Sequence, residues 1–420
     1  MTQQLELPES LVKAAEEKKW PLDLVRQGIS AGVAADRIEQ VIRSGATPQQ
    51  AVAMLANMRA GAPGATLQGL QANITPAAAG PPPLDMSWAE VPTERGFFPE
   101  IGPQGLELKD VEQSSYGIIP DYWPYENDQP RGSYMPPDTG NLPASYSIYK
   151  KSEVWAPSSA ALYEEAIRGH WVSATAIPWE SLKPLPQHEE LAIDQLCTNW
   201  SEQSHNGLEC ISKWLEEISY GFHEVKLYLA TACFDYGRQT EAFRKRALAN
   251  GGGLGTQTPG VYTRAAYSAM KFSEMVTIVM VARASMQITL WEEFGHLLTR
   301  SDADKKLLEL STRDLKRHLQ YGLEHLAYFL QVEPQKRGQV KAWLARAEGA
   351  IGAEWARNKP HNEAIMLLLD ADPRAARAKL KGIWRRQVEA YKAYLASISL
   401  RNHEISPMLA RNIEEQHPAA

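Results

Sequence analysis

Apolar residues recur at three- and four-residue steps from Ser158 onward, and this spacing is typical of amphipathic helices. Strand-like alternation is absent from this stretch. The predicted helices are one at 158–168, four long ones at 188–218, 222–249, 264–299 and 302–330, and two more at 334–357 and 373–395. Long consecutive helices of this kind predict an all-α fold, with a four-helix bundle at 158–333 and extra C-terminal helices at 334–420.

The first part of the chain, residues 1–58, predicts a small module of short helices. A basic residue, a glycine and a short helix occur twice, in VRQGISAGVAADRIEQVI and in IRSGATPQQAVAML. Thr47 and Pro48 form a good helix start, because threonine caps and proline fits the first turn. A unit this small buries little surface, so it serves either as a docking module or as a solvated appendage.

Two segments of different composition separate this module from the predicted bundle. Residues 59–86 are rich in alanine, glycine and proline with almost no charge, which is typical of a semi-extended linker. Residues 87–157 remain rich in proline but carry many aromatic rings, which disordered segments lack. We expect an irregular arm anchored by its rings on a surface, belonging either to this chain or to a neighbour.

Composition and charge exclude several classes of protein. The 420 residues include only 3 cysteines, without the CxxC spacing of a disulfide scaffold or zinc site. The net charge of −6 is unfavourable for nucleic-acid binding. The polar start lacks the apolar core of a signal peptide, and no apolar run is long enough to span a membrane. We therefore expect a cytoplasmic protein with reduced thiols.

Polar residues interrupt the apolar stripe near the middle of all four long helices. They are the run 201–207 in the first helix, Gln239 in the second, Ser285 and Thr289 with Arg283 and Gln287 close by in the third, and His318 and His325 in the fourth. Buried polar groups need partners. An internal polar layer in a four-helix bundle is the usual place for a metal or cofactor site.

Two of these helices carry the same short pattern 79 residues apart, Asp235-Tyr-Gly-Arg-Gln239 and Asp314-Leu-Lys-Arg-His318. With the segments YEEAIRGHW, AIPWE, FDYGRQTEAFRKRALANGGGLG and DLKRHLQYGLEHL, this pattern resembles the ferritin-like di-iron carboxylate superfamily, in particular an uncharacterised bacterial branch. The resemblance covers about residues 158–330. In that family two Asp-Glu-x-Arg-His motifs and two further glutamates hold two metals that activate oxygen.

The resemblance implies that most metal ligands are missing from this chain. The family's ligand positions correspond to Asn206, Tyr236, Gln239, Ser285, Leu315 and His318, and only His318 keeps a ligating side chain. The placements of Asn206 and Ser285 rest on counting and carry an uncertainty of about one turn. The groups that support the ligands in the family remain, as Asp235, Arg238, Asp314 and Arg317.

Three functional hypotheses follow. The first is a catalytically degenerate structural or regulatory subunit without a cofactor, in a homo- or hetero-oligomer with a metal-bearing paralogue. The second is an active oxidoreductase with iron or manganese at a displaced or mononuclear site, for which Glu202, His205, Glu209 and His318 are the candidate ligands. The third is a binding protein that uses the former metal cavity for a small molecule. Tyr236 is either a redox or proton-transfer phenol or a residue that fills the space left by the metals.

Other conspicuous motifs have structural interpretations. The glycine-rich GGGLG at 251–255 follows a helix rather than a strand, so we expect an interhelical loop and no phosphate site. His223 with Glu224, and Glu324 with His325, are expected at the surface or at helix ends. The basic stretch 374–392 is expected to be a solvated helix face.

Overall fold

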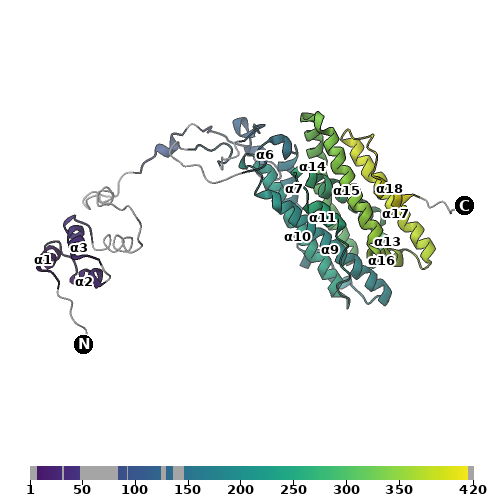
Figure 1. Ribbon diagram of the computed structural model, residues 1–420, viewed down its shortest axis with the longest axis horizontal. Helices are drawn as coiled ribbons and strands as arrows, with labels where there is room; N and C mark the ends of the chain where they lie inside the picture. Colours follow the sequence, from purple (N-terminus) through teal and green to yellow (C-terminus); the bar gives the residue numbers. More distant parts are fainter. Residues whose placement is uncertain are drawn as a thin grey trace. The chain divides into compact units, whose positions relative to one another are not determined.

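The computed structural model describes residues 7–30, 33–47, 84–91, 93–123, 129–135 and 146–414 (Figure 1). The chain divides into two compact units, Met1–Val91 and Pro92–Ala420. Each unit is built around its own buried apolar residues, and each is described separately below.

The N-terminal unit consists of α1 (Glu9–Glu17), α2 (Leu22–Ser30) and α3 (Ala35–Arg43), followed by the 3₁₀ turn η1 (Ser87–Ala89). The first three helices bury Leu11, Val25 and Ile38 against one another, and the indole N–H of Trp20 donates to the carbonyl of Ala46 at 3.1 Å. The predicted module therefore has a small core of its own. Pro48 and nearly all of the predicted linker lie outside the described residues.

The larger unit contains the predicted bundle. Its long elements are α9 (Gln187–Leu215), α10 (His223–Ala249), a composite third element and α14 (Asp302–Val332). Helix α10 packs against both α9 and α14, and α14 packs against the third element (Figure 1). Their facing sides form one continuous apolar core. The prediction of an all-α fold built on a bundle of long helices is confirmed within the described residues.

The third element differs from the single helix predicted at 264–299. It begins as α11 (Val261–Tyr267), breaks, and resumes as α12 (Phe272–Val276), the π-helical segment η6 (Thr277–Arg283) and α13 (Ala284–Leu298). A π-helical turn holds more residues than an α-helical turn, so it shifts the residues that follow it around the axis. This shift decides which side chains of α13 face the bundle.

The C-terminal helices form a further layer on the bundle. They follow the turn η7 (Pro334–Lys336) and comprise α15 (Arg337–Arg357), α16 (Lys359–Leu369), α17 (Pro373–Ser397) and α18 (Pro407–Ile413). Helix α15 packs against η6, and α17 packs against α13. The sequence patterns missed α16 and α18. The buried Glu348 joins the layer's ends, accepting hydrogen bonds from the Tyr391 hydroxyl at 2.9 Å and the Ser406 amide at 2.7 Å.

Several residues of the aromatic arm that belong to the larger unit contact the bundle. The arm contains α6 (Leu108–Val111), η2 (Ser114–Gly117) and η3 (Lys151–Glu153), and leads into α7 (Ser159–Arg168), α8 (Ser173–Ala176) and η4 (Trp179–Ser181). The Trp123 ring lies so close to Gly221, in η5 (Tyr220–Phe222), that a Cβ there would be 2.5 Å from it. The Ile148 amide donates to the carbonyl of Glu217 at 2.9 Å. These residues anchor part of the arm on the same chain, and a surface of a neighbouring chain stays a prediction for the rest.

The GGGLG segment is an interhelical loop, as predicted. A Cβ on Gly252 would collide with the Asp194 carboxylate, and one on Gly255 would lie 2.5 Å from the Gln195 side chain. These glycines allow the loop to lie directly against α9. No helix of the described ranges is both long and apolar enough to cross a bilayer.

Candidate functional site

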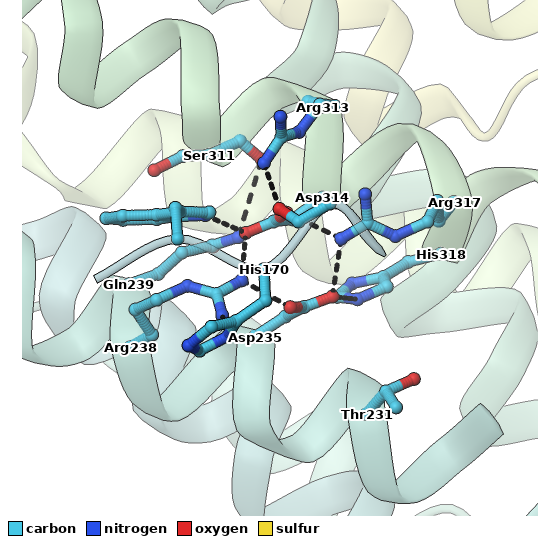
Figure 2. Close-up of polar contacts among 12 residues, drawn as sticks. His170, Thr231, Asp235, Arg238, Gln239, Ser311, Arg313, Asp314, Arg317 and His318 are labelled. Atoms are coloured by element: carbon cyan, nitrogen blue, oxygen red, sulfur yellow. Dashed lines mark hydrogen bonds and ion pairs between the residues drawn. The ribbon is translucent and has the colours of Figure 1, made fainter. Parts of the chain in front are cut away.

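Two aspartates and two arginines form a closed ring of ion pairs between α10 and α14 (Figure 2). We call Asp235, Arg238, Asp314 and Arg317 the charge cluster. Arg238 contacts Asp235 and lies 2.8 Å from Asp314, and Arg317 lies 2.9 Å from Asp235 and 2.6 Å from Asp314. All four side chains are buried. Two positive and two negative charges cancel, so the ring can be buried where a single charge could not.

Residues between α7 and α8 close one side of the charge cluster. The Trp171 indole N–H donates to Asp314 at 2.9 Å, and the Arg238 guanidinium stacks 4.5 Å from the centre of the Trp171 ring. His170 Nδ1 lies 3.1 Å from Arg238 (Figure 2). These contacts give a structural role to His170 and Trp171, the last two residues of the segment YEEAIRGHW.

His318 faces the charge cluster. Its Nε2 lies 3.3 Å from Asp235 Oδ2, and its ring centre lies 4.6 Å from that of Tyr236. Burial raises the pKa of Asp235, but the hydrogen bond with His318 and the charges of His318, Arg317 and Arg238 outweigh it, so the pKa lies below its ordinary value. Asp235 is therefore an ionised acceptor that orients the imidazole.

A small space, which we call the central cavity, is lined by residues of α9, α10, α14 and the composite third element. Its volume is about 20 Å³. It is lined by Trp200, Gln203, Ser204, Tyr236, Gln239, Tyr262, Val279, Arg283, Ala284, Gln287, Trp291 and Leu315. A cavity needs roughly 10–15 Å³ to hold one water molecule, so this one has room for a single atom-sized ligand. Organic ligands need several hundred cubic ångströms.

Three of the six predicted ligand positions, Tyr236, Gln239 and Leu315, line the central cavity, and three, Asn206, Ser285 and His318, do not. Asn206 donates to the Thr263 hydroxyl of α11 at 2.6 Å. Ser285 donates to the Ala282 carbonyl of its own helix at 3.1 Å. Ser285 is fully buried but does not line the central cavity, so its assignment as a former ligand position stays a prediction.

The third element contributes Arg283 and Gln287 to the central cavity instead. Arg283 donates to Gln287 Oε1 at 2.7 Å, and its guanidinium lies 5.6 Å from the Tyr262 ring centre. No carboxylate within the described ranges forms an ion pair with Arg283. Burial lowers the pKa of Arg283 from its ordinary value, the expected effect on a poorly compensated cation. The sequence signal for these two residues was their spacing, an arginine and a glutamine four residues apart in an apolar run, which places them on one face of a helix.

Tyr236 fills much of the space beside the central cavity. Its ring packs against Gly207 of α9, where a Cβ would lie 2.7 Å from the ring. Burial raises the pKa of the Tyr236 phenol, so it is neutral at physiological pH. This packing agrees with a space-filling role, and the redox role remains a prediction.

The residues of the alternative metal set are not brought together. His205 and Glu209 lie 3.2 Å apart with about half of each side chain exposed. Glu202 accepts a hydrogen bond from the Thr258 amide at 3.0 Å, while His318 is fully buried beside the charge cluster. The only group of three metal-ligating side chains within 4.8 Å of one another, in the ranges that the structure describes, is elsewhere.

That group joins the arm to the start of α10. It consists of Glu112, His223 and Glu224. The Glu112 carboxylate lies 2.6 Å from His223 Nε2 and 3.4 Å from Arg131, which also contacts Glu224. Burial raises the pKa of Glu224, but the hydrogen bond from Arg131 and the charge of His223 hold it below its ordinary value. The guanidinium of Arg131 thus lies where a metal ion bound by Glu112 and Glu224 would lie.

The expectation of surface or helix-end positions holds for Glu224 and is wrong for His325. Glu224 lies in the first turn of α10 as predicted, yet only 1% of it is exposed, because Arg131 of the arm covers it. His325 is fully buried, with its Nδ1 3.0 Å from the Trp155 carbonyl and its Nε2 2.8 Å from the Ser273 hydroxyl. Both contacts come from segments distant in sequence, so local patterns gave no sign of them.

Comparison with known proteins gives distant structural similarity only. No protein-family model and no curated protein matches the chain. Similar solved structures include an R2-like ligand-binding oxidase with an anaerobically reconstituted Mn/Fe cofactor, which has 15% sequence identity and a TM-score of 0.41 and matches over 60% of this chain and 93% of its own. Another structure of such an oxidase, with an aerobically reconstituted Mn/Fe cofactor, has 15% identity and a TM-score of 0.40, with 60% and 93% covered.

The Mn/Fe cofactor is a property of those proteins. Similarity of this size is compatible with the helical fold, and the chemistry of this chain has to be judged from its own residues.

Proposed function

We propose that this chain is a non-catalytic relative of the ferritin-like di-iron proteins, and that it serves as a structural or regulatory subunit of an oxidase- or oxygenase-type assembly. One observation carries the proposal. The central cavity, where predicted ligand positions meet, is lined by the cation Arg283 and by no carboxylate.

The side chains of the central cavity do not fit iron or manganese. Such ions need carboxylate oxygens or imidazole nitrogens with free electron pairs. Of the predicted ligand positions that line the central cavity, Tyr236 is a neutral phenol, Gln239 is an amide and Leu315 is apolar. The guanidinium of Arg283 adds a positive charge that repels a divalent cation.

The charge cluster has a structural role in this proposal. All four carboxylate oxygens of Asp235 and Asp314 accept contacts from arginine, histidine or tryptophan side chains. They connect α10 to α14 and both helices to the segment after α7. The residues that would support metal ligands thus hold the bundle together without a metal.

Exposed apolar residues on the arm support the existence of a partner. Phe98, Ile101 and Ile118 are 92%, 75% and 70% exposed, although the same arm buries Trp123 and Arg131 against the bundle. Large apolar side chains concentrated in one short segment are typical of protein interaction sites. The separate core of the N-terminal unit fits a second docking element.

A displaced metal site is the second candidate, and the group Glu112, His223 and Glu224 favours it. Two carboxylates and an imidazole are suitable ligands for iron or manganese. A metal there would have to displace Arg131, which already balances the two carboxylates.

The subunit proposal is tested by the assembly state of the full chain. The chain is co-expressed with the products of neighbouring genes and examined by size-exclusion chromatography with light scattering. We expect a defined oligomer or hetero-complex, weakened by Phe98→Glu and Ile101→Glu, and unchanged by the control Lys306→Glu on the exposed face of α14. A lone monomer under every condition would refute the proposal.

A further inference from the structure

The wall of the central cavity contains several hydrogen-bond donors without acceptors. The indole N–H groups of Trp200 and Trp291 and the amide nitrogen of Gln287 have no partner among the described residues. These three side chains are only 4–5% exposed, and all three line the central cavity. Buried donors are rarely left unpaired, because each costs about 1–3 kcal/mol.

The orientation of Gln287 is fixed by its neighbour. Arg283 can only donate, so its hydrogen bond engages Oε1 of Gln287 and leaves the amide N–H₂ group unpaired. The fully buried side-chain atoms of this wall that have no partner among the described residues are therefore all N–H donors.

The charge in the wall is positive. Arg283 has no ion pair within the described ranges. The closest candidate is Glu354, which lies with Arg283 along an adjoining space of about 10 Å³. Its Oε2 accepts from the Val261 and Tyr262 amides at the start of α11, at 2.8 and 3.3 Å. No aspartate or glutamate lines the central cavity itself.

We propose that the central cavity binds one monoatomic anion of the halide class, held by the charge of Arg283 and the N–H groups of Trp200, Gln287 and Trp291. Chloride is the probe and the expected ligand. The volume of about 20 Å³ admits a single ion and excludes an organic acid. The bound anion supplies the charge that Arg283 lacks and the acceptor that three donors lack. The proposal rests on the proposed function in one respect, that the central cavity holds no metal.

Two measurements on the full chain test this proposal. Thermal unfolding is followed in increasing sodium chloride against sodium gluconate of equal ionic strength, and crystals are soaked in bromide for anomalous diffraction. We expect a saturable, chloride-specific rise in Tm, and one bromide peak beside Arg283. Gln287→Glu, which keeps the size of the side chain but places a negative charge in the wall, and Arg283→Met should both abolish the effect. The control Arg264→Met, on the exposed face of α11, should keep it.

The outcomes are distinguishable. No bromide peak in the wild type, or an equal Tm rise in both salts, would overturn the anion site and leave the proposed function intact. A bromide peak that persists in Gln287→Glu would also overturn it. A metal ion in the central cavity would refute both the anion site and the proposed function. If Arg283→Met fails to fold, the bromide peak of the wild type and its loss in Gln287→Glu still test the anion site.

Discussion

The charge cluster and the central cavity are both lined by α10 and α14, and they differ in how their charges are compensated. Asp235 and Arg238 point to the first, while Tyr236 and Gln239, each the next residue along the chain, point to the second. In the charge cluster each cation contacts two carboxylates. In the central cavity, Arg283 has none within 4 Å in the ranges that the structure describes.

This difference shows how a metal-binding fold can keep its frame while losing its site. The charge cluster stabilises the bundle through its own ion pairs and needs no metal. The central cavity has no ligands, a fixed positive charge and unpaired donors. Removing a charge from the charge cluster should therefore lower the free energy of unfolding strongly, whereas removing the charge of Arg283 should change it little.

The largest effect is expected for Arg317→Met in the charge cluster. Removing this cation leaves Asp235 and Asp314 with one arginine between them, and breaking a buried pair costs about 3–5 kcal/mol. We expect a loss of this size in the free energy of unfolding, measured with urea. Lys306→Met, which breaks the exposed pair with Glu309 on the same helix, should cost less than about 1 kcal/mol. Equal losses would show that the charge cluster has no special role.

Asp194 provides a negative counterpart to Arg283. Burial raises its pKa to about 6, and its Oδ1 has no partner among the described side chains. Because the folded state holds a proton that the unfolded state releases near pH 4, stability should fall as pH rises from about 4 to 6. We expect Asp194→Asn to match the wild type below pH 4 and to exceed it above pH 6 by up to about 3 kcal/mol.

The measurement for Asp194 is urea unfolding of both proteins between pH 3.5 and 8. The Asn variant keeps an acceptor for the Gly253 amide, so the loop contact is preserved. A difference that is the same at every pH would mean that the carboxylate does not titrate as described.

Packing beside the central cavity is tested with two glycines of the bundle. Gly207→Ala places a methyl group 2.7 Å from the Tyr236 ring, and overpacking of this kind costs about 1–3 kcal/mol. Gly237→Ala meets nothing within 4 Å and should stabilise α10 by up to about 1 kcal/mol. Urea midpoints should therefore move in opposite directions. Shifts of the same sign would contradict the close packing of Tyr236.

The smallest effect is expected for Arg283→Met in a halide-free buffer. The variant loses a hydrogen bond to Gln287 but also loses the cost of burying an uncompensated cation. We expect the free energy of unfolding to stay within about 1 kcal/mol of the wild type. A loss like that of Arg317→Met would show that Arg283 is paired as firmly as the charge cluster.

The fold and the charge cluster were accessible from the sequence for a physical reason. The stripes of long amphipathic helices are local patterns, and the paired Asp-x-x-Arg motifs placed Asp235, Arg238, Asp314 and Arg317 on facing helices. Both patterns can be recognised even when the helix register is wrong by a residue or two.

The composition of the central cavity was not accessible in the same way. Nothing in the run TIVMVAR marks the π-helical turn η6. Arg283 and Gln287 line the central cavity, whereas Ser285 is buried beside them without lining it. The burial of Glu224 depends on Arg131 of the arm, 93 residues away. Contacts between distant segments leave no periodic trace in the sequence.

The central claim is that the central cavity excludes divalent metals, and metal content tests it most directly. The full chain is expressed in medium supplemented with iron and manganese, its metals are measured by elemental analysis, and urea unfolding is compared with and without a chelator. The account predicts far less than one ion per chain and no chelator effect. One or two tightly held ions per chain, lost in His318→Gln and retained in His223→Gln, would contradict it. Loss in His223→Gln alone would place the metal at Glu112 and Glu224.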